Sequence, residues 1–487
     1  MKNQEAPLIV EKIGGTSMAD TKAVLENVLL RRREGDFYRR IVVVSAYAGV
    51  TNMLLEHKKT GEPGVYALFA SAEGDWSWGD ALNRVAERMQ SINRDIFGDH
   101  ADRQTADNFV RERIEGVRSC LLDLQRLCSY GHFRLDEHLM TVREMLSGLG
   151  EAHSAHNTML LLRQRDVNAT FVDLTGWRDE TQPTLEQRIR QALGGLDLSA
   201  ELPIVTGYAH CQEGLMRAYD RGYTEVTFSN IAVLMNAVEA VIHKEFHLSS
   251  ADPKIVGEDN VRKIGRTNYD VADQLSNMGM EAVHPRAAKG LRQSEIPLRV
   301  KNTFDPGDPG TVFRGDYVAD APGTEIVTGR RDVLALEFFE QDMVGVKGYD
   351  AAILSSLDRH KVSIISKSSN ANAITHYLGG SLKAVKRVIA DLEERFPAAS
   401  ISVRKVAIVS AIGTDLNKPA LTANAVGALS DAEVGLLGLH QTMRNVDIQF
   451  ILEQDHYERA VVVLHNALIS IDRATLAPAE AAEKAAA

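Results

Sequence analysis

A short apolar segment that runs into two adjacent glycines most constrains how this chain can fold. Residues 10–18 read VEKIGGTSM. The pattern predicts a strand with Lys12 near its end, a tight turn at Gly14 and Gly15, and a helix that begins near Ser17. Bare glycine amides beside a helix N-terminus form an anion site, and Lys12 would direct a positive charge at it. Taken alone, the same pattern also fits a simple strand–helix connection.

Further apolar segments extend this beginning into an α/β pattern. Residues 39–49, RRIVVVSAYAG, form a second strand-like segment, and residues 19–33 between the two have a helical pattern. A strand, a helix and a second strand in this order are the unit of a parallel sheet. Three more strand-like segments continue the series, at 168–174, 202–207 and 239–246. We therefore predict a layered α/β domain.

Residues 75–150 differ from their surroundings because they are polar and helical in pattern. Apolar side chains recur there every three or four positions, as on one face of an amphipathic helix. These positions are Val110, Ile114, Val117, Leu121, Leu124 and Cys128. We predict a helical insertion that caps the sheet domain, with a partner-binding helix as the alternative.

The C-terminal part contains two weakly similar blocks. Each has a helix, a strand, a polar turn and another strand, and Val362 and Val434 hold matching places in them. Such a repeat predicts a pair of small α/β modules. We divide the chain into a first domain at 1–318 with its helical insertion at 75–150, modules at 330–400 and 401–473, and a frayed tail at 474–487. The second module could be inserted within the first.

Composition excludes several functional classes. The chain has 55 Lys and Arg against 66 Asp and Glu, a net charge of −11, which gives no support to a nucleic-acid or membrane-surface role. Its three cysteines argue against a disulfide framework and for a reducing compartment. No apolar run approaches the roughly 18 residues needed to span a bilayer. We predict a cytoplasmic protein, and no Cys/His spacing leads us to assign metal-ligating residues.

A second turn follows the second strand-like segment. Residues 42–52, VVVSAYAGVTN, place Ser45, Gly49 and Thr51 where they would lie beside the first turn, at the carboxyl edge of a parallel sheet. Lys-x-Gly-Gly-Thr-Ser followed by Ser-Ala-x-x-Gly-x-Thr-Asn, in this order and spacing, resembles the aspartate kinases, which have the amino-acid-kinase fold. Other segments extend the resemblance over nearly the whole chain: Gly-Glu at 150–151, DRGYTEVT at 220–227, HKEFHLSSADPK at 243–254 and GMEAVHP at 279–285.

The resemblance implies an amino-acid-kinase-like sheet domain followed by two ACT-like regulatory modules, through which chains of that family form homodimers. It implies that ATP, with Mg²⁺, phosphorylates the side-chain carboxylate of L-aspartate, the first step of aspartate-family biosynthesis. The acceptor is already an anion, so no general base is needed. Cations and amides must instead offset the repulsion between like charges.

The resemblance also assigns residues to roles. Lys12, Arg221 and Glu225 would be catalytic, with Glu225 orienting Lys12 and Arg221 holding a substrate carboxylate. Glu151 would hold the substrate ammonium group. Hydrogen bonds to the substrate would come from Ser45, Thr51 and Thr224. The nucleotide would contact Lys12, Gly14, Gly15, Lys244, Glu245 and Lys254.

Several residues depart from the family pattern. Asp220 and Tyr223 replace glycines, Glu225 replaces an aspartate, and Glu281 replaces a lysine expected beside the phosphates, for which Lys244 could compensate. Three interpretations stay open at this point: a diverged active kinase for aspartate, a kinase for another acidic amino acid, and a non-catalytic amino-acid sensor of the same fold.

The regulatory half departs at one position. Lysine-sensitive members of the family carry an acidic residue where this chain has Ile365. An apolar side chain cannot pair with a buried ammonium group, and leaving such a group unpaired is costly. We predict that inhibition by lysine is weak or absent.

Overall fold

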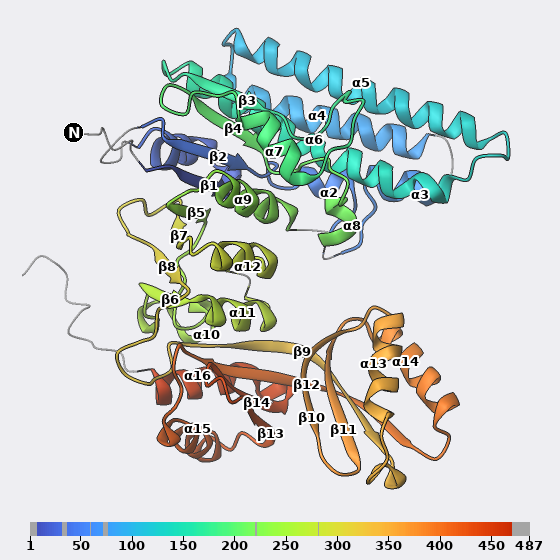
Figure 1. Cartoon of the computed structure of the whole chain (residues 1–487), viewed down its shortest axis with the longest axis vertical. Coiled ribbons are helices and arrows are strands. Elements are labelled where there is room, and N and C mark those ends of the chain that lie inside the picture. The colour runs from blue at the N-terminus through green and yellow to red at the C-terminus, as the bar shows by residue number, and fades with distance from the viewer. Residues whose placement is uncertain are drawn as a thin grey trace, which may run out of the picture. The chain divides into compact units, whose positions relative to one another are not determined.

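The computed structural model describes residues 7–31, 37–58, 60–71, 76–219, 222–280 and 282–469. The chain divides into two compact units (Figure 1). They comprise Met1–His247 with Val283–Gly315, and Leu248–Ala282 with Asp316–Ala487.

The first unit is built on a sheet whose strands follow the order β3-β4-β2-β1-β5-β7-β8. Neighbouring strands are parallel from β3 through β7, and β8 runs antiparallel to β7. The five predicted strands are confirmed, and β2 and β4 are buried along their whole length, as expected for parallel strands. The bounds are β1 Ile9–Ile13, β2 Arg40–Val44, β3 Ala169–Val172, β4 Leu202–Thr206, β5 Glu239–Lys244, β7 Leu298–Asn302 and β8 Thr311–Arg314.

Three long helices confirm the helical pattern at 75–150 and lie at the top of Figure 1. Helix α4 packs on α5, α5 packs on α6, and α6 packs on β3 and β4. The repeating apolar face of α5 is buried at Val110, Ile114, Val117 and Leu121. The longer helices of this unit are α4 Ser77–Phe97, α5 Asp102–Cys128, α6 Leu135–Arg163, α7 Leu185–Leu193, α9 Tyr223–Leu234 and α12 Pro285–Gln293. The shorter ones are α1 Thr21–Val24, a π-helix at Leu25–Leu29, α2 Val50–Leu54, α3 Val65–Ser71 and α8 Leu215–Tyr219.

The first helical segment begins at Ser17 as a 3-10 turn, and α1 follows it. Ser17 is buried, begins the short 3-10 turn Ser17–Ala19, and accepts a hydrogen bond from the Thr303 hydroxyl at 3.0 Å. Asp20 caps α1 instead. Helical structure therefore begins near Ser17 as predicted, first as a 3-10 turn, and the α-helical part follows from Thr21.

The second unit contains a six-stranded sheet in the order β10-β11-β9-β12-β14-β13, antiparallel throughout. The long strands β9 and β12 run through two separate apolar cores, one under α13 and α14 and the other under α15 and α16. The two predicted α/β modules therefore share strands. The bounds are β9 Ile326–Phe339, α13 Tyr349–Arg359, β10 Ser363–Ser369, β11 Ala373–Gly379, α14 Leu382–Arg395, β12 Ser400–Ile412, α15 Pro419–Asp431, β13 Leu436–Gln441, β14 Asp447–Glu453 and α16 Tyr457–Leu468.

The segment 248–282, which the sequence placed in the first domain, groups with the second unit. Ala251 lies in the same apolar core as Leu464, and the Ser250 carbonyl accepts a hydrogen bond from the Val327 amide at 2.8 Å. The segment contains α10 Pro253–Val256, a 3-10 turn at Glu258–Asn260, β6 Arg266–Asn268 and α11 Tyr269–Asn277. Within the described parts of the chain, no helix has both the length and the apolar character needed to cross a bilayer.

A fully buried charged network joins the central strands of the first unit. Glu11 accepts a hydrogen bond from Arg40 Nε at 2.6 Å, and its other carboxylate oxygen lies 2.7 Å from His243 Nε2. Arg40 also donates to the carbonyls of Val28 and Leu29. The network ties β1 to β2, β5 and the π-helix.

Replacing Glu11 by alanine is expected to destabilise the first unit by roughly 3–5 kcal/mol, because Arg40 is then left buried without its counter-ion. The shift in urea midpoint measures this loss. Glu186→Ala removes an exposed partner of Arg190 and should cost at most about 1 kcal/mol. A Glu11→Ala loss as small as that of the control would contradict the interpretation.

Candidate active site

The carboxyl ends of parallel strands meet at one edge of the sheet, and Lys12 lies there. It is the second-last residue of β1 and pairs in register with Val43 of β2 and Ile242 of β5. Lys12 is only 7% exposed. A buried ammonium group requires a negative partner nearby.

Glu225 is that partner. One oxygen of its carboxylate lies 3.2 Å from Lys12 Nζ, and the other accepts a hydrogen bond from the His284 amide at 2.5 Å. Burial alone would raise the pKa of Glu225. The positive charges of Lys12 and Lys244 and the His284 hydrogen bond outweigh burial and hold that pKa below its usual value. Glu225 is therefore ionised, and it fixes the position of the Lys12 ammonium group.

The first turn of α9 supplies Glu225 because Gly222 allows the chain to pass close to His284. Gly222 has a φ of +107°, and a Cβ there would lie 2.7 Å from the His284 ring. His284 is the N-cap of α12. Asp220, Arg221 and Glu281 lie outside the described residues.

The predicted glycine turn is closely packed between two neighbouring strands. A Cβ on Gly14 would lie 3.3 Å from the His243 carbonyl oxygen, and one on Gly15 would lie 3.0 Å from that of Ala46. The Gly14 amide donates to the His243 carbonyl at 3.1 Å. The Gly14 amide is thus engaged within the sheet, contrary to the expectation of two bare amides.

Glu151 contributes a second buried carboxylate, from α6. Tyr223 donates to one of its oxygens at 2.9 Å, and the other oxygen has no hydrogen-bond partner in the described parts of the chain. Burial raises the pKa of Glu151 to about 7, although the Tyr223 hydrogen bond acts in the opposite direction. The unpaired oxygen is suited to an ammonium group.

Helix α6 can bring Glu151 to the edge because Gly150 lies against the second turn. A Cβ on Gly150 would come within 2.6 Å of Ala46 Cβ. The Ser154 hydroxyl also donates to the Ser45 carbonyl at 2.8 Å.

The predicted hydroxyl donors come from three elements. Ser45 follows β2, and its amide donates to the Ile13 carbonyl at 3.2 Å. Thr51 lies in the first turn of α2. Thr224 is buried in the first turn of α9, next to Gly207, where a Cβ would be 2.5 Å from Thr224 Cγ2.

The predicted nucleotide residues are divided between the units. Lys244 ends β5, and its charge acts on Glu225; Glu245 follows it and is exposed. Lys254 is the second residue of α10 in the second unit and is exposed, so its role stays a prediction.

Two residues that support the site, Tyr223 directly and Glu144 through Tyr208, were not recognised in the sequence. Tyr223 was read only as a departure from a glycine, yet it positions Glu151. Glu144 accepts hydrogen bonds from the Tyr208 hydroxyl and from the Met216 amide. Glu144 precedes Glu151 by seven residues, which is two turns along one helix face, and this spacing was a signal that could have been found.

One group of three described side chains has the spacing of metal ligands: His247, Asp305 and Asp308. One ring nitrogen of His247 lies 3.0 Å from Asp305, and the other lies 3.7 Å from Asp308. The two carboxylates face opposite nitrogens of the ring, and a single ion could bind only one of those nitrogens. This arrangement suits a histidine held by a hydrogen bond to Asp305, with Asp308 nearby on the other side.

Comparison with known proteins identifies the family. The model of the "Amino acid kinase family" matches residues 7–302. The aspartate kinase Ask_Ect of Stutzerimonas stutzeri (strain A1501) is 51% identical over 461 residues, covering 94% of this chain and 97% of that protein. The chain belongs to the amino acid kinase family, among the aspartate kinases.

More distant aspartate kinases also match this chain over nearly its whole length. The aspartokinase of Candida albicans (strain SC5314 / ATCC MYA-2876) is 24% identical over 519 residues, covering 95% of this chain and 90% of that protein. The structure of E. coli aspartokinase III in complex with lysine and aspartate has a TM-score of 0.71 at 19% identity, covering 96% of this chain and all of that one. This likeness confirms the fold of a kinase domain followed by regulatory domains.

The buried Glu151 gives this aspartate kinase a pH-dependent stability. Its folded pKa of about 7 exceeds the ordinary value of 4.5, so the folded state loses stability as pH rises from about 4.5 to about 7 and levels off above. Glu151→Gln removes this loss. The variant should gain stability over the wild type across that range, by on the order of 3 kcal/mol at pH 8.

Urea unfolding at a series of pH values, without ligands, measures the difference. Glu115→Gln, at an exposed position on α5, is the control and should show none of the trend. A difference between Glu151→Gln and wild type that does not change with pH would show that Glu151 ionises normally.

Proposed function

We propose that the chain transfers the γ-phosphoryl group of ATP to the side-chain carboxylate of L-aspartate, giving 4-phospho-L-aspartate. The observation that carries the proposal is the buried Lys12–Glu225 pair at the carboxyl edge of the sheet. The 51% identical relative is named an aspartate kinase, in line with this reaction. A non-catalytic sensor is not favoured, because it would not need a buried cation at this edge.

Charge governs the mechanism. The nucleophilic carboxylate and the triphosphate repel each other, and no proton has to be removed from the acceptor. Lys12, held by Glu225, would stabilise the charge on the transferred group, with the Gly15 amide beside it. Lys244 adds a second positive charge near the same carboxylate.

Substrate recognition would use the second buried carboxylate. The unpaired oxygen of Glu151 would accept the ammonium group of aspartate, while Ser45, Thr51 and Thr224 donate hydrogen bonds. Arg221 would bind a substrate carboxylate.

Mg²⁺ would enter with the nucleotide. Both oxygens of Glu225 are already hydrogen-bonded, so the described residues fit an ion held mainly by phosphate oxygens and water. When bound, it neutralises phosphate charge.

The proposal includes a cytoplasmic homodimer that assembles through the regulatory modules. Both edge strands of the six-stranded sheet expose apolar side chains, and such edges favour pairing with another chain. These side chains are Ile364 on β10 and Leu436, Leu437 and Leu439 on β13.

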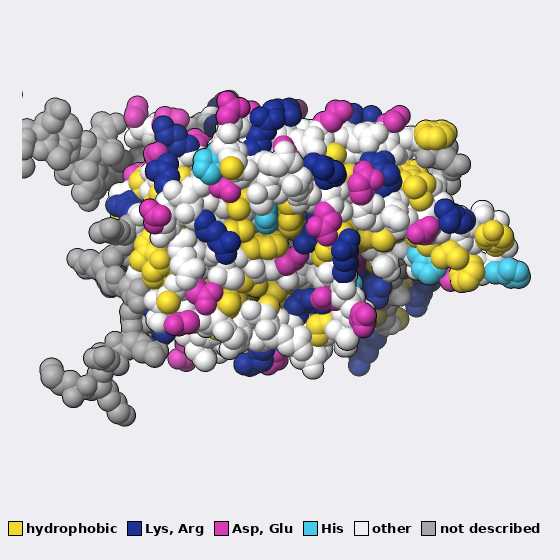
Figure 2. Space-filling model, turned by 90° about the horizontal axis from the view of Figure 1, so that it is seen from above, with side chains coloured by type: hydrophobic (Ala, Val, Ile, Leu, Met, Phe, Trp, Pro, Cys, Tyr) yellow, Lys and Arg dark blue, Asp and Glu magenta, His cyan; other side chains and the backbone are white. Residues whose placement is uncertain are grey.

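The helical face seen in Figure 2 mixes Lys and Arg with Asp and Glu, unlike the basic stripe of a nucleic-acid-binding surface.

Lys12→Ala should lower kcat at least about a hundredfold, because one preorganised positive donor to the transferring group is lost. A hydroxamate assay with ATP, Mg²⁺ and either L-aspartate or L-glutamate measures the acyl phosphate. Lys22→Ala, which removes an exposed lysine ten residues further on, should leave the rate unchanged.

Two outcomes of that assay would refute the proposal. Undiminished activity of Lys12→Ala would remove Lys12 from the mechanism. Preference for L-glutamate over L-aspartate would favour the kinase for another acidic amino acid.

Inhibition by lysine should be weak or absent. Ile365 is buried at an irregularity in the pairing of β10 with β11, and its carbonyl accepts a hydrogen bond from Asn277 Nδ2 at 3.0 Å. Its apolar side chain offers no partner to an ammonium group. Initial rates during a lysine titration, with potassium chloride at matched ionic strength as control, test this; half-inhibition by sub-millimolar lysine would refute it.

A further inference from the structure

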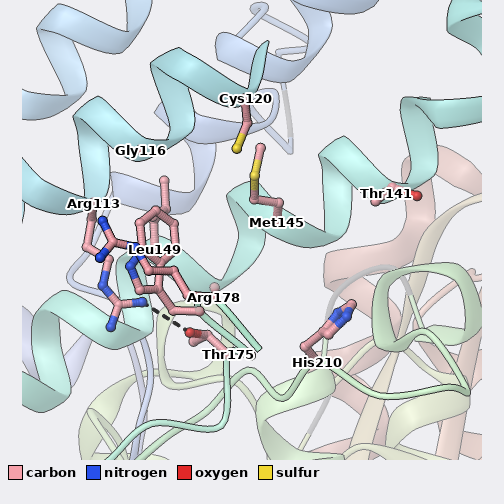
Figure 3. Close-up of a pocket in the computed structure, with 12 residues that line it drawn as sticks. Arg113, Gly116, Cys120, Thr141, Met145, Leu149, Thr175, Arg178 and His210 are labelled. Atoms are coloured by element: carbon pink, nitrogen blue, oxygen red, sulfur yellow. Dashed lines mark hydrogen bonds between the residues drawn. The ribbon is translucent and has the colours of Figure 1, made fainter. Parts of the chain in front are cut away.

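A separate cavity of about 280 Å³ lies in the first unit (Figure 3). Helices α5 and α6 and the loops that follow β3 and β4 form its walls. None of the described residues assigned above to substrate or nucleotide lines it. Its volume suits a molecule the size of a small monocyclic acid.

Glycines in the wall allow its parts to approach closely. A Cβ on Gly116 of α5 would lie 2.6 Å from the Trp177 ring. One on Gly176, whose φ is +68°, would lie 2.8 Å from the His210 ring. The cavity is therefore shaped by backbone positions that larger residues could not occupy without displacing these rings.

Its polar groups are donors rather than acids. Among the described residues, the lining includes Arg113, Arg178 and His210 but no aspartate or glutamate. Arg113 is already used, since it pairs with Asp173 at 2.5 Å. Arg178 is exposed and has a longer pair to Glu112, at 3.4 Å, so its guanidinium group can turn to a ligand.

Trp177 supplies a further donor. Its indole nitrogen is buried and has no hydrogen-bond acceptor in the described parts of the chain. An unsatisfied buried N–H costs about 1–3 kcal/mol, so an acceptor at this position would be stabilising. The side chains of Met145 and Leu149 add apolar surface to the same cavity.

We propose that this cavity binds a small carboxylate with an apolar body and no ammonium group, and that its occupancy changes the affinity for the amino-acid substrate. The absence of an acidic side chain in the lining disfavours amines. The second part rests on the proposed function, because it assumes that Glu151 holds the substrate ammonium group.

A short chain of contacts connects the cavity to Glu151. Gly148, in the cavity wall, has no room for a Cβ, which would lie 3.0 Å from the Tyr208 ring. Tyr208 packs edge-to-face on Tyr223, with ring centroids 5.5 Å apart, and Tyr223 donates to Glu151. A ligand that shifts α6 at Gly148 therefore also shifts the ring that positions Glu151.

Tryptophan fluorescence gives a binding readout that does not require catalysis. The chain has three tryptophans; Trp76 is highly exposed and is removed by Trp76→Phe, while Trp78 is buried elsewhere and gives a constant background. The probes are phenylacetate, neutral phenylethanol and cationic phenylethylamine. We expect saturable change with phenylacetate, and at least about tenfold weaker binding of the other two.

Matched arginine variants test the anion contact. Arg178→Gln should weaken phenylacetate binding about tenfold or more. Arg190→Gln is the control, since Arg190 is also exposed and pairs with one glutamate but does not line the cavity. Met145→Phe, which fills part of the cavity without adding a tryptophan, should weaken binding strongly.

Calorimetric titration of L-aspartate, with and without saturating phenylacetate, tests the coupling. We expect at least a threefold change in Kd, which Arg178→Gln reduces. No saturable binding, equal binding of the three probes, or phenylacetate binding with unchanged aspartate affinity would each overturn the proposal. If aspartate binds but is not phosphorylated, the proposed function is refuted, and the calorimetric titration still measures whether phenylacetate changes the affinity for aspartate.

Discussion

The active-site edge depends on keeping two opposite charges, those of Lys12 and Glu225, out of water. Desolvating such a pair costs several kcal/mol per ion, and attraction repays this only with good geometry and further hydrogen bonds. The His284 amide supplies one such bond to Glu225, and Lys244 adds a favourable charge. Every element that brings these groups together is thereby constrained: the end of β1, the start of α9 and the segment before α12.

The strand β1 carries a buried charge on each of its faces. Glu11 faces Arg40 and His243, while its neighbour Lys12 faces Glu225. Because successive side chains of a strand point to opposite faces, a slip of one residue in register would exchange the two charges and leave both without partners. The polar contacts therefore specify the register of β1 against β2 and β5, where the apolar residues of neighbouring strands alone would tolerate more than one alignment.

The sequence predicted what depends on local pattern. Strand segments, the long helices and the repeated modules follow from hydrophobic periodicity, and the Lys12–Glu225 pairing followed from the family resemblance. Contacts between distant segments were not predictable in this way. The Ser17 hydroxyl accepts a hydrogen bond from Thr303, nearly three hundred residues away. Residues 248–282 pack with the regulatory half because Ala251 is buried in the apolar core of that half. Nothing in either local pattern marks these partners.

The departures from the family motif are connected in the structure. Glu225, one methylene longer than the aspartate it replaces, contacts both Lys12 and the His284 amide. Tyr223, in place of a glycine, holds Glu151 by a hydrogen bond and leaves its second oxygen unpaired. A chain that had lost catalysis would gain stability by replacing such buried charges, because charge burial without a ligand is unfavourable. The buried charges are retained, and Tyr223 gives Glu151 a hydrogen-bond partner for one of its oxygens. This favours a site whose sequence diverged while it continued to bind and phosphorylate its substrate.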